Sequence, residues 1–515
     1  MKVLDANKHG IGYEKHPCTI GDLLDVCEIH NGDHEKSSLL ITGISSDSRK
    51  IKNGDLFLAV RGIKNDGGNY IDDAIKLGAS AIFLESDEDF FSKKYKEKEV
   101  FFIPNLSEKI SAIADKFYSH PSRQLSVIGI TGTNGKTSCA HMIASVANKI
   151  GMCGSVIGTL GYGIYDGSNY EMTRTGFTTP DAIKIQECLV HLLESSSDTV
   201  AVEVSSHALS LNRVDAVNFN VAVFTNLSRD HLDFHQTMAN YAEAKRKLFS
   251  LPDIETAVIN IDDDLGERLA SEFSDKFNLI TYSTYNHNAD IYATDKEFFF
   301  DSIKTKIVTP FGVREITVPL LGEFNISNIL ASLASLLALG EEFETVVPAF
   351  EKIKPIKGRM EVIPQKNKSF PIVVVDYAHT PVALEKALTS LRPHVGGKLW
   401  CIFGCGGERD QGKRSEMARI AKKLSDEVII TSDNPRKEPI NQIIDDILIG
   451  IDEMKNVYVE IDRSDAISFA IKTAELNDII LIAGKGHEDY QIIGDKRVFH
   501  SDILFVERFF EGCES

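Results

Sequence analysis

The most regular feature of the chain is a series of short apolar runs, each followed by small or polar residues and then by a stretch with helical periodicity. In the middle of the chain these runs lie at 126–131, 199–204, 221–225 and 257–261. Continuous apolar strands that alternate with helices are typical of a mostly parallel sheet covered on both faces. The pattern therefore predicts an α/β fold.

Four apolar runs in the last third of the chain each stop at a cluster of Gly, Asp, Asn, His or Arg residues. The four segments read IVVVDYAHTP, LWCIFGCGGERD, VIITSDNPR and IILIAGKGHEDY. In open α/β sheets, ligands bind outside the carboxyl ends of the strands. Four polar clusters at four such ends predict one shared binding site.

Two interruptions of the pattern predict domain boundaries. The segment SHPSRQL at 119–125 separates a helical stretch at 107–118 from the next apolar strand, and a second break lies near 355–358. At roughly 150 residues per domain, a chain of 515 residues agrees with three domains. We predict domains at 1–122, 123–356 and 357–515, with short strands at 55–60, 81–84 and 100–103 in the first and an antiparallel edge or side sheet at 291–320 in the second.

Composition and charge narrow the class of protein. Hydrophobic residues make up 43% and charged residues 25%, as in ordinary globular proteins. Because 56 Lys and Arg face 75 Asp and Glu, the net charge of −19 argues against non-specific binding to nucleic acid or anionic lipid. The first 18 residues contain no apolar signal region, and the longest apolar helical run, 329–339, is too short to cross a bilayer. The eight cysteines are scattered without a CxxC pair, so we expect reduced thiols and a cytoplasmic protein.

The strongest local signal for chemistry is GTNGKT at 132–137, between a predicted strand and a helix from 137 to 150. Glycines in this setting let backbone N–H groups surround phosphate oxygens. Lys136 would contact the β and γ phosphates, and the hydroxyl of Thr137 would face Mg²⁺. The usual GxxxxGK pattern is only half matched, because its first glycine falls on Ile130. A structural turn is the alternative.

Two further strand ends carry acidic residues and histidines. Glu203 ends TVAVEV and is followed by SSH, which suits a Mg²⁺ ligand, although a cap for the next helix is the alternative. The segment TNLSRDHLDFH offers phosphate or metal contacts, and a polar loop without a ligand is the alternative. Its polar residues are Asn226, Asp230, His231, Asp233 and His235.

Lys245 and the segment LGEFNISN are ambiguous by pattern. The sequence YAEAKRKLF predicts that Lys245 belongs to a solvated basic face with Arg246 and Lys247. Gly322, with the asparagines at 325 and 328, precedes an apolar helix, where either helix capping or nucleotide contact is consistent with the residue types.

The C-terminal clusters combine arginines with carboxylates. Arginine pairs bidentately with a carboxylate, and Asp or Glu accepts from an ammonium group, so the set suits a zwitterion. Charge pairs on the surface are the alternative. The residues are Arg409, Asp433, Asn434, Arg436, Lys485, His487 and Glu488. No Ser/His/Asp hydrolase motif stands out, and the GxGxxG dinucleotide fingerprint is absent.

Taken together, the ordered motifs GTNGKT, EVSSHAL, TNLSRDHLDFH, GxxNxxN, DYAHTP, FGCGGERD, SDNPR and AGKGHEDY resemble those of the Mur ligase family, over about residues 45 to 502. The resemblance implies a domain for the UDP end of the substrate, a central P-loop-type ATPase with a mostly parallel sheet, and a Rossmann-like C-terminal domain for an amino acid. Within the family the chain resembles members that add meso-2,6-diaminopimelate to UDP-N-acetylmuramoyl-L-alanyl-D-glutamate. ATP would phosphorylate the D-glutamyl carboxylate, and the amine would attack the acyl phosphate. We expect a monomer without nucleic-acid or membrane partners.

The resemblance also assigns residues. For ATP it implies Gly132, Thr133, Asn134, Gly135, Lys136, Thr137, Ser138, Asn325 and His379. For the UDP-linked dipeptide it implies Ser46, Ser48, Ile63, Lys64, Asn65, Thr178, Thr179, Ser205, Leu211 and Arg213. For diaminopimelate it implies Arg409, Asp433, Asn434, Pro435, Arg436, Gly484 and Glu488.

Catalytic and metal roles follow from the same resemblance. Lys136, Glu203, His231 and Lys245 are implied as catalytic, and Mg²⁺ would be held by Thr137, Glu203, His231 and Lys245. Lys245 matches a lysine that the family carries as an N6-carboxylate, which replaces the interpretation as a basic face. The chain departs from the family at Glu408, where aspartate is usual, and after Arg436, where KEP is one residue shorter.

Rival functions share the ATPase core. A sister ligase that adds alanine, glutamate or a D-alanyl dipeptide, or a folylpolyglutamate synthetase, would carry similar central motifs. The arginine of DNPR favours diaminopimelate as the substrate over lysine. Diaminopimelate has a distal carboxylate that the arginine can bind, and lysine does not. A nucleotide-dependent scaffold without activity would need a degraded phosphate loop, whereas Lys136, Thr137 and Glu203 are all present.

Overall fold

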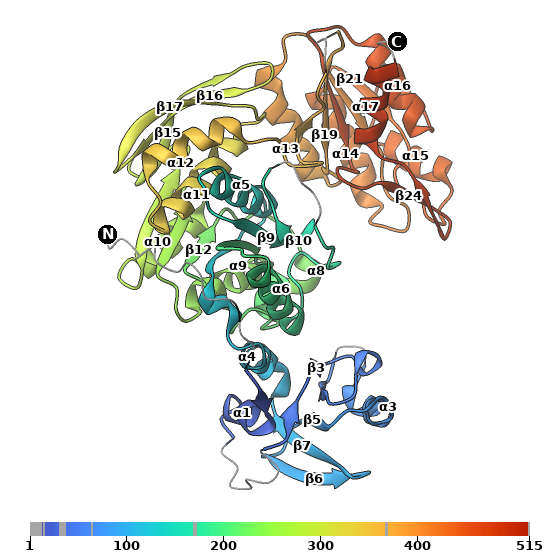
Figure 1. The fold of residues 1–515 in the computed structure, drawn as a ribbon. Helices are drawn as coiled ribbons and strands as arrows, with labels where there is room; N and C mark the ends of the chain where they lie inside the picture. Colours follow the sequence, from blue (N-terminus) through green and yellow to red (C-terminus); the bar gives the residue numbers. More distant parts are fainter. Residues whose placement is uncertain are drawn as a thin grey trace. The chain divides into compact units, whose positions relative to one another are not determined.

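The computed structural model describes residues 13, 16–29, 38–62, 65–167, 172–365 and 369–512. The fold is α/β with mostly parallel sheets, as the apolar pattern predicts (Figure 1). The chain forms two compact units. The first unit comprises residues 1–291 and 330–346, and the second comprises 292–329 and 347–515.

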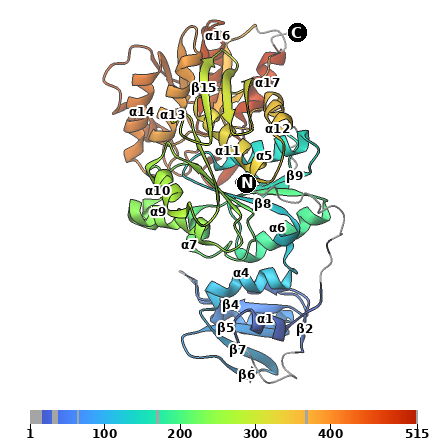
Figure 2. The ribbon, with the colours of Figure 1, turned by 90° about the vertical axis from the view of Figure 1, so that its left-hand side faces the viewer.

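The N-terminal part of the first unit is a five-stranded sheet in the order β3 (Ile44–Ser45), β4 (Leu56–Ala59), β5 (Ala81–Ser86), β7 (Lys98–Pro104), β6 (Phe91–Tyr95). All pairings are parallel except β6 with β7. Helices α1 (Ile20–Asp25) and α4 (Leu106–Phe117) pack on one face of this sheet (Figure 2), and α3 (Ile71–Leu77) packs on the other. The strands predicted at 55–60, 81–84 and 100–103 are confirmed.

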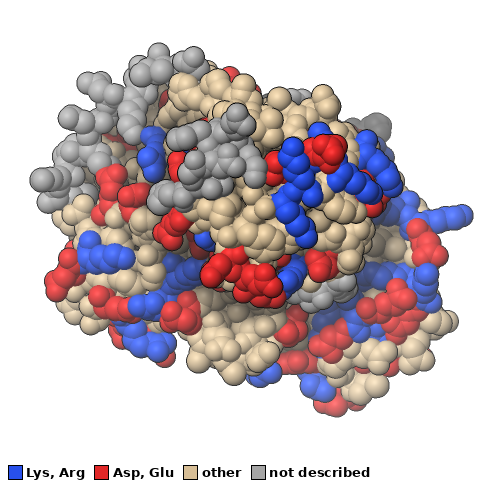
Figure 3. Space-filling model, turned by 90° about the horizontal axis from the view of Figure 1, so that it is seen from below, with Lys and Arg blue, Asp and Glu red and all other residues tan. Residues whose placement is uncertain are grey.

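Charged side chains of both signs are interspersed on the molecular face in Figure 3. This distribution agrees with the acidic balance of the sequence and offers no broad basic surface on that face. No helix in the described part of the chain is both long and apolar enough to cross a bilayer. The seven cysteines that the structure describes are free thiols, and Cys513 lies outside the described residues.

The central sheet of the first unit runs β10 (Gly161–Ile164), β9 (Gly154–Gly158), β11 (Thr199–Glu203), β8 (Ser126–Thr131), β12 (Val221–Phe224), β13 (Thr256–Asn260), β14 (Asn278–Ser283). Only β10 is antiparallel to its neighbour. The central strands predicted from the sequence are therefore confirmed.

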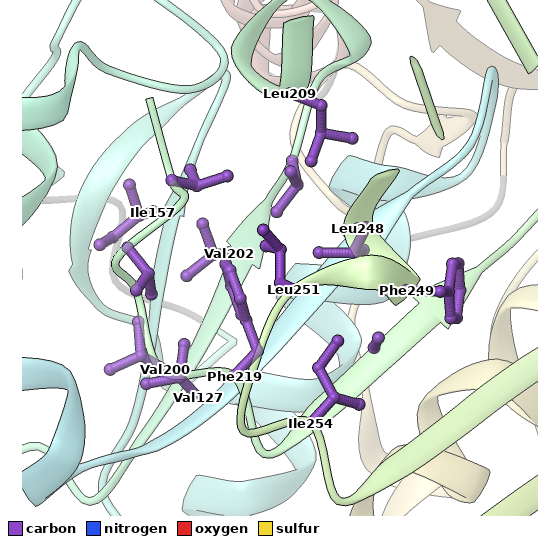
Figure 4. Close-up of a cluster of buried hydrophobic side chains, with 14 of the residues drawn as sticks. Val127, Ile157, Val200, Val202, Leu209, Phe219, Leu248, Phe249, Leu251 and Ile254 are labelled. Atoms are coloured by element: carbon purple, nitrogen blue, oxygen red, sulfur yellow. The ribbon is translucent and has the colours of Figure 1, made fainter. Parts of the chain in front are cut away.

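Both faces of this sheet are buried. On one face, Val127, Ile157 and Val200 from three strands pack together (Figure 4), against helices α6 (Ala182–Glu194) and α10 (Asp264–Phe273). Because side chains alternate along a strand, Ile128 points to the opposite face, where α5 (Lys136–Lys149) packs on β8, β9 and β11. This alternation explains why the strands read as continuous apolar runs.

The second unit begins with an antiparallel meander, β15 (Ile291–Phe298), β16 (Ile303–Thr309) and β17 (Gly312–Val318), which confirms the antiparallel sheet predicted at 291–320. Helices α11 (Phe324–Ala338) and α12 (Phe343–Ala349) follow in the chain, and their residues within 330–346 belong to the first unit. His394 supports the meander from the η6 turn (Arg392–His394), because its Nε2 accepts from the Gly322 N–H at 3.0 Å and its Nδ1 bonds the Phe299 carbonyl.

The C-terminal sheet has the order β18 (Glu361–Val362), β19 (Ile372–Asp376), β23 (Ile479–Ala483), β20 (Leu399–Phe403), β21 (Glu427–Ile430), β22 (Val457–Val459). Apart from β18, all pairings are parallel. Helices α13 (Pro381–Leu391), α14 (Gly412–Leu424) and α15 (Ile440–Leu448) cover one face, while α16 (Arg463–Thr473) and α17 (Asp502–Gly512) cover the other. The four polar clusters therefore follow four parallel strands of one sheet.

Candidate active site

The segment GTNGKT forms a tight loop between β8 and α5. Gly132 has a φ of +151°, and a Cβ at this position would lie 1.8 Å from Thr225 Oγ1, so only glycine fits. Gly135 has a φ of +90° and directly precedes α5. Both glycines therefore adopt a backbone conformation that other residues disfavour. The loop that they form ends at a helix N-terminus, where anions bind.

Lys136 folds back over this loop. Its Nζ donates to the carbonyl oxygens of Gly132 at 2.7 Å and Thr133 at 3.0 Å. The ammonium group is thus held at the mouth of the loop, where phosphate oxygens would compete with these carbonyls for it.

The loop after β12 is bonded to the phosphate loop. Asn226 accepts from the N–H of Asn134 at 3.0 Å through its side chain and from the N–H of Thr133 at 2.8 Å through its carbonyl. The N–H of Ser228 donates to Thr133 Oγ1 at 2.9 Å, and Thr225 Oγ1 donates to the Asn134 carbonyl at 2.6 Å. Asn226 therefore braces the loop backbone, a role that its sequence motif does not reveal.

Glu203 is a wholly buried carboxylate beside the loop. Its Oε2 accepts from the hydroxyls of Thr137 at 2.8 Å and Thr159 at 3.0 Å, and its Oε1 accepts from the Thr159 N–H at 2.8 Å. A Cβ on Gly158 would lie 2.1 Å from Oε1, so the glycine makes room for the acid. Glu203 does not cap α7 (Ser206–Ser210), because Ser205 does, and the capping alternative is wrong.

This donor set fits Mg²⁺. Glu203 pairs with no lysine or arginine anywhere in the described ranges, so three hydrogen bonds from neutral donors are all that offsets its buried charge there. The structure has no cluster of three or more His, Cys, Asp or Glu side chains able to hold a metal, again counting only described residues. Mg²⁺ needs only a few protein ligands, such as one carboxylate and one hydroxyl, when phosphates and water supply the others.

Three histidines and a tyrosine form an aromatic cluster next to the phosphate loop. The rings of His207 and His231 lie 4.9 Å apart, and that of His235 lies 5.0 Å from Tyr241. The Tyr241 hydroxyl is 3.2 Å from Thr133 Oγ1, which links the cluster to the loop. Burial and the neighbouring histidines lower the pKa of His207 and of His235, so both favour the neutral form.

Lys245 lies in α9 (Met238–Arg246) and is 1% exposed, so the prediction of a solvated basic face is wrong for this residue. Its Nζ lies 4.3 Å from the centroid of the Tyr241 ring. Neighbouring Arg246 and Lys247 instead form ion pairs with Glu272 and Asp215. A run of three basic residues suggests a basic surface, but consecutive residues of a helix point in different directions, and the run does not show which of them is turned inward.

Burial, and next the positive charge of Lys136, lower the pKa of Lys245 well below its usual value. The structure records no ion pair or hydrogen bond for its ammonium within the described part of the chain. A buried lysine without an anionic partner is strongly disfavoured in its charged form. Lys245 therefore favours the neutral amine.

The residues predicted to contact the dipeptide meet beside Glu203. Thr179 Oγ1 donates to the Glu203 carbonyl at 2.6 Å and lies 3.2 Å from Ser205 Oγ. Arg213 Nη1 donates to the Thr179 carbonyl at 3.0 Å, and Thr178 Oγ1 lies 3.1 Å from Thr159 Oγ1. Leu211 is exposed nearby, at the end of α7.

The residues predicted to contact uridine lie on loops of the N-terminal sheet. Ser46 is exposed directly after β3, Ser48 is buried at the start of η1 (Ser48–Lys50), and Asn65 is exposed before η2 (Gly67–Tyr70). Ile63 and Lys64 lie outside the described residues.

The four polar clusters of the C-terminal sheet contact one another. Lys485, after β23, bonds Asp433 and Asn434, after β21. Arg436 Nη1 donates to the Gly407 carbonyl after β20 at 2.8 Å. The ring centroids of Tyr377, after β19, and His487, after β23, lie 5.4 Å apart.

Charge pairs on the surface, the alternative interpretation, are wrong for the centre of this group. Lys485 is fully buried, and Asp433 and Asn434 are 7% exposed. Pro435 lies between Asn434 and Arg436 in the same loop, and Gly484 precedes Lys485 with a φ of +117°. Arg409 is exposed at the rim.

Asn325 and His379, the two predicted ATP contacts of the second unit, make local hydrogen bonds. Asn325 donates through Nδ2 to the Leu321 carbonyl at 2.8 Å and accepts through Oδ1 from Asn328 Nδ2 at 3.0 Å, so it stabilises the start of α11. His379 is exposed, with Nδ1 2.8 Å from the Tyr377 carbonyl. Their contact with ATP stays a prediction.

Sequence reasoning missed Thr159 and Thr225. Thr159 supplies two of the three hydrogen bonds to the Glu203 carboxylate, and Thr225 donates to the Asn134 carbonyl of the phosphate loop. Thr225 carried a usable signal, since it ends an apolar strand directly before Asn226. Thr159 stands in no motif, and only the pairing of β9 with β11 brings it to Glu203.

Comparisons with known proteins match successive parts of the chain to one family. Three family models match: "Mur ligase family, catalytic domain" over 40–118, "Mur ligase middle domain" over 130–336 and "Mur ligase, glutamate ligase domain" over 358–486. The chain is 45% identical over 476 residues to a Pseudomonas aeruginosa protein named UDP-N-acetylmuramoyl-L-alanyl-D-glutamate--2,6-diaminopimelate ligase, covering 92% of this chain and 96% of that protein. A protein of the same name from Coxiella burnetii is 43% identical over 471 residues, 91% and 95% of the two chains. A solved structure with this name is similar with a TM-score of 0.73 and 31% identity, covering 97% of this chain and 100% of the other.

Proposed function

The chain belongs to the Mur ligase family, and from this premise we propose that it joins meso-2,6-diaminopimelate to UDP-N-acetylmuramoyl-L-alanyl-D-glutamate at the expense of ATP. The observation that carries the proposal is identity of 43 to 45%, over more than 90% of the chain, with proteins named for this reaction. The product would be a precursor of peptidoglycan, formed in the cytoplasm by a monomeric enzyme.

The first half-reaction transfers the γ-phosphoryl group of ATP to the D-glutamyl carboxylate. Residues 132–138 bind the phosphates at the N-terminus of α5, and Lys136 stabilises the charge that develops on the transferred group. Thr137, Glu203 and His231 would hold Mg²⁺, which neutralises negative charge on the phosphates when it is bound. The hydrogen bonds of Thr137 and Thr159 to Glu203 support this role, because they fix the carboxylate beside the loop.

Lys245 acts in this proposal as an N6-carboxylate. A carbamate forms when a neutral amine attacks CO₂ and loses a proton, and the lowered pKa of Lys245 supports this chemistry. The product is an anion that would turn an unpaired buried amine into a metal ligand. His207 and His235, which favour their neutral forms, add no net charge near the new anion.

In the second half-reaction the amine of diaminopimelate attacks the acyl phosphate, and the amide forms as phosphate leaves. Thr178, Thr179, Ser205, Leu211 and Arg213 would hold the dipeptide, while residues 46, 48 and 63–65 would hold the uridine nucleotide. Asn325 and His379 complete the proposed ATP contacts. The proximity of Thr179 to Glu203 supports a dipeptide carboxylate close to the phosphate loop.

Diaminopimelate would bind at the C-terminal strand ends. Arg409 and Arg436 would pair with its carboxylates, and Glu488 with Asp433 to Asn434 would accept from an ammonium group. The hydrogen bond from Arg436 to the Gly407 carbonyl supports a guanidinium directed into this group of loops.

One assay tests the function. Phosphate release should be measured with ATP, the UDP-linked dipeptide and each of meso-diaminopimelate, L-lysine and D-alanyl-D-alanine. We expect sustained release with meso-diaminopimelate alone. Equal release with L-lysine would contradict the substrate assignment and leave the ligase assignment standing.

Replacing Arg436 by alanine should lower kcat/KM for meso-diaminopimelate by about 30-fold or more, because a bidentate contact to the distal carboxylate is lost. The KM for ATP should stay within about twofold, since the phosphate loop belongs to the other unit. Arg436→Lys should also be impaired, because an ammonium group lacks the planar fork of a guanidinium. Lys437→Ala is the matched control, since Lys437 makes an exposed ion pair with Asp495. An Arg436→Ala enzyme with wild-type kcat/KM would exclude this role.

A further inference from the structure

Lys485 is a fully buried lysine at the carboxyl end of β23. Its Nζ lies 3.1 Å from Glu488 Oε2, 3.3 Å from Asn434 Oδ1 and 3.5 Å from Asp433 Oδ1. An ammonium group has three N–H donors, and three acceptors surround this one. A buried lysine is tolerated when its charge is matched in this way.

The same contacts decide which atoms of the three neighbours stay available. Glu488 Oε2 accepts from both Lys485 and Asn434 Nδ2, whereas Oε1 receives no hydrogen bond from any described residue. Asp433 likewise uses Oδ1 for Lys485 and leaves Oδ2 without a donor among the described residues. Asn434 Oδ1 is filled by Lys485 and by the N–H of Ile492. Each acid therefore keeps one carboxylate oxygen for a ligand.

The net charge of these residues also suits a cationic ligand. Asp433 and Glu488 carry two negative charges and Lys485 one positive charge. The neighbouring cation Arg463 is already matched by a buried ion pair with Asp502. The group is thus left with about one excess negative charge, which suits the ammonium group of an amino acid.

We infer that Lys485 is a positioning residue for the amino-acid substrate: it holds one oxygen each of Asp433, Asn434 and Glu488, so that Asp433 Oδ2 and Glu488 Oε1 face the substrate ammonium. Lys485 itself does not touch the substrate. The inference rests on the proposed function, because it takes the amino-acid site to lie at these strand ends.

The test replaces Lys485 with methionine, which keeps the length of the side chain and removes its charge and donors. Without the ammonium, the two carboxylates repel each other and lose their common anchor. We expect the KM for meso-diaminopimelate to rise by about 30-fold, with kcat changed by less than about threefold. Lys398→Met is the matched control, because Lys398 makes an ion pair with Glu427 from the surface of the same sheet.

A second readout separates this inference from the proposed function. Hydroxylamine traps acyl phosphates as hydroxamates, and this reaction needs ATP and the UDP-linked dipeptide but no diaminopimelate. Lys485→Met should form hydroxamate at the wild-type rate. Absence of hydroxamate from the wild-type enzyme would overturn the proposed function itself.

Two results would overturn the positioning role. One is a wild-type KM for meso-diaminopimelate in a folded Lys485→Met enzyme, and the other is an equal loss of hydroxamate formation and amide formation, as expected of a general structural defect. If Lys485→Met does not fold, Lys485→Gln supports the same measurements, since glutamine removes the charge that holds Asp433 and Glu488 together. An unchanged KM in that variant counts equally against the inference.

Discussion

Alanine in place of Lys136 is expected to lower kcat by about 1,000-fold or more, which is the scale of losing a charge aimed at a transferred phosphoryl group. The Lys136 ammonium already lies at the mouth of the phosphate loop, on the carbonyls of Gly132 and Thr133. Alanine therefore leaves the developing charge without this partner. Phosphate release under saturating substrates measures the effect.

The matched control for Lys136 is Lys149→Ala at the other end of α5, where the side chain bonds the Asp166 carbonyl at 3.4 Å. This variant should turn over at close to the wild-type rate. Both variants should unfold at similar temperatures. Phosphate release at the wild-type rate from folded Lys136→Ala would refute the assignment of the loop.

Removal of the Lys245 side chain should lower kcat by about 100-fold or more, because the proposed carbamate anion would be lost next to the phosphate loop. Acetate or another short carboxylate should restore part of the activity of Lys245→Ala by entering the vacated space. Arg246→Ala provides the control, since Arg246 lies on the same helix but pairs with Glu243 and Glu272. It should be nearly as active as wild type and gain nothing from acetate.

The carbamate has a direct spectroscopic readout. Enzyme equilibrated with ¹³C-bicarbonate should give a carbamate carbon resonance that Lys245→Ala lacks. Carbamate forms from the neutral amine, and the pKa of Lys245 is lowered, so the resonance should be present at neutral pH and decline as acid protonates the amine. An active enzyme without this resonance would contradict the modification.

The sequence was most informative where a residue pattern corresponds to one backbone geometry. Apolar runs such as 126–131 predicted buried parallel strands, and the helix predicted from 137 was found from Lys136 onward. Gly132 and Gly135 were recognisable because a phosphate loop needs backbone conformations that favour glycine.

The pattern was least informative where tertiary contacts decide the environment of a side chain. Lys245 reads as one of three consecutive basic residues, but it alone is buried, on the same side of α9 as Tyr241 one turn earlier. Thr159 reaches Glu203 because two strands distant in sequence pair in parallel, which no local spacing encodes. The resemblance to a family supplied Lys245 as a candidate, but not the hydrogen bonds that surround it.

The hydrogen bonds between the phosphate loop and residues 225–228 make these two segments one cooperative element for local unfolding. The amides of Thr133, Asn134 and Ser228 all end on atoms of the opposite segment, so none can exchange its proton with solvent unless the two segments separate. A ligand that stabilises the phosphate loop therefore also stabilises the loop that leads to Asp230 and His231. A nucleotide that never touches those two residues would still reduce the range of positions they sample.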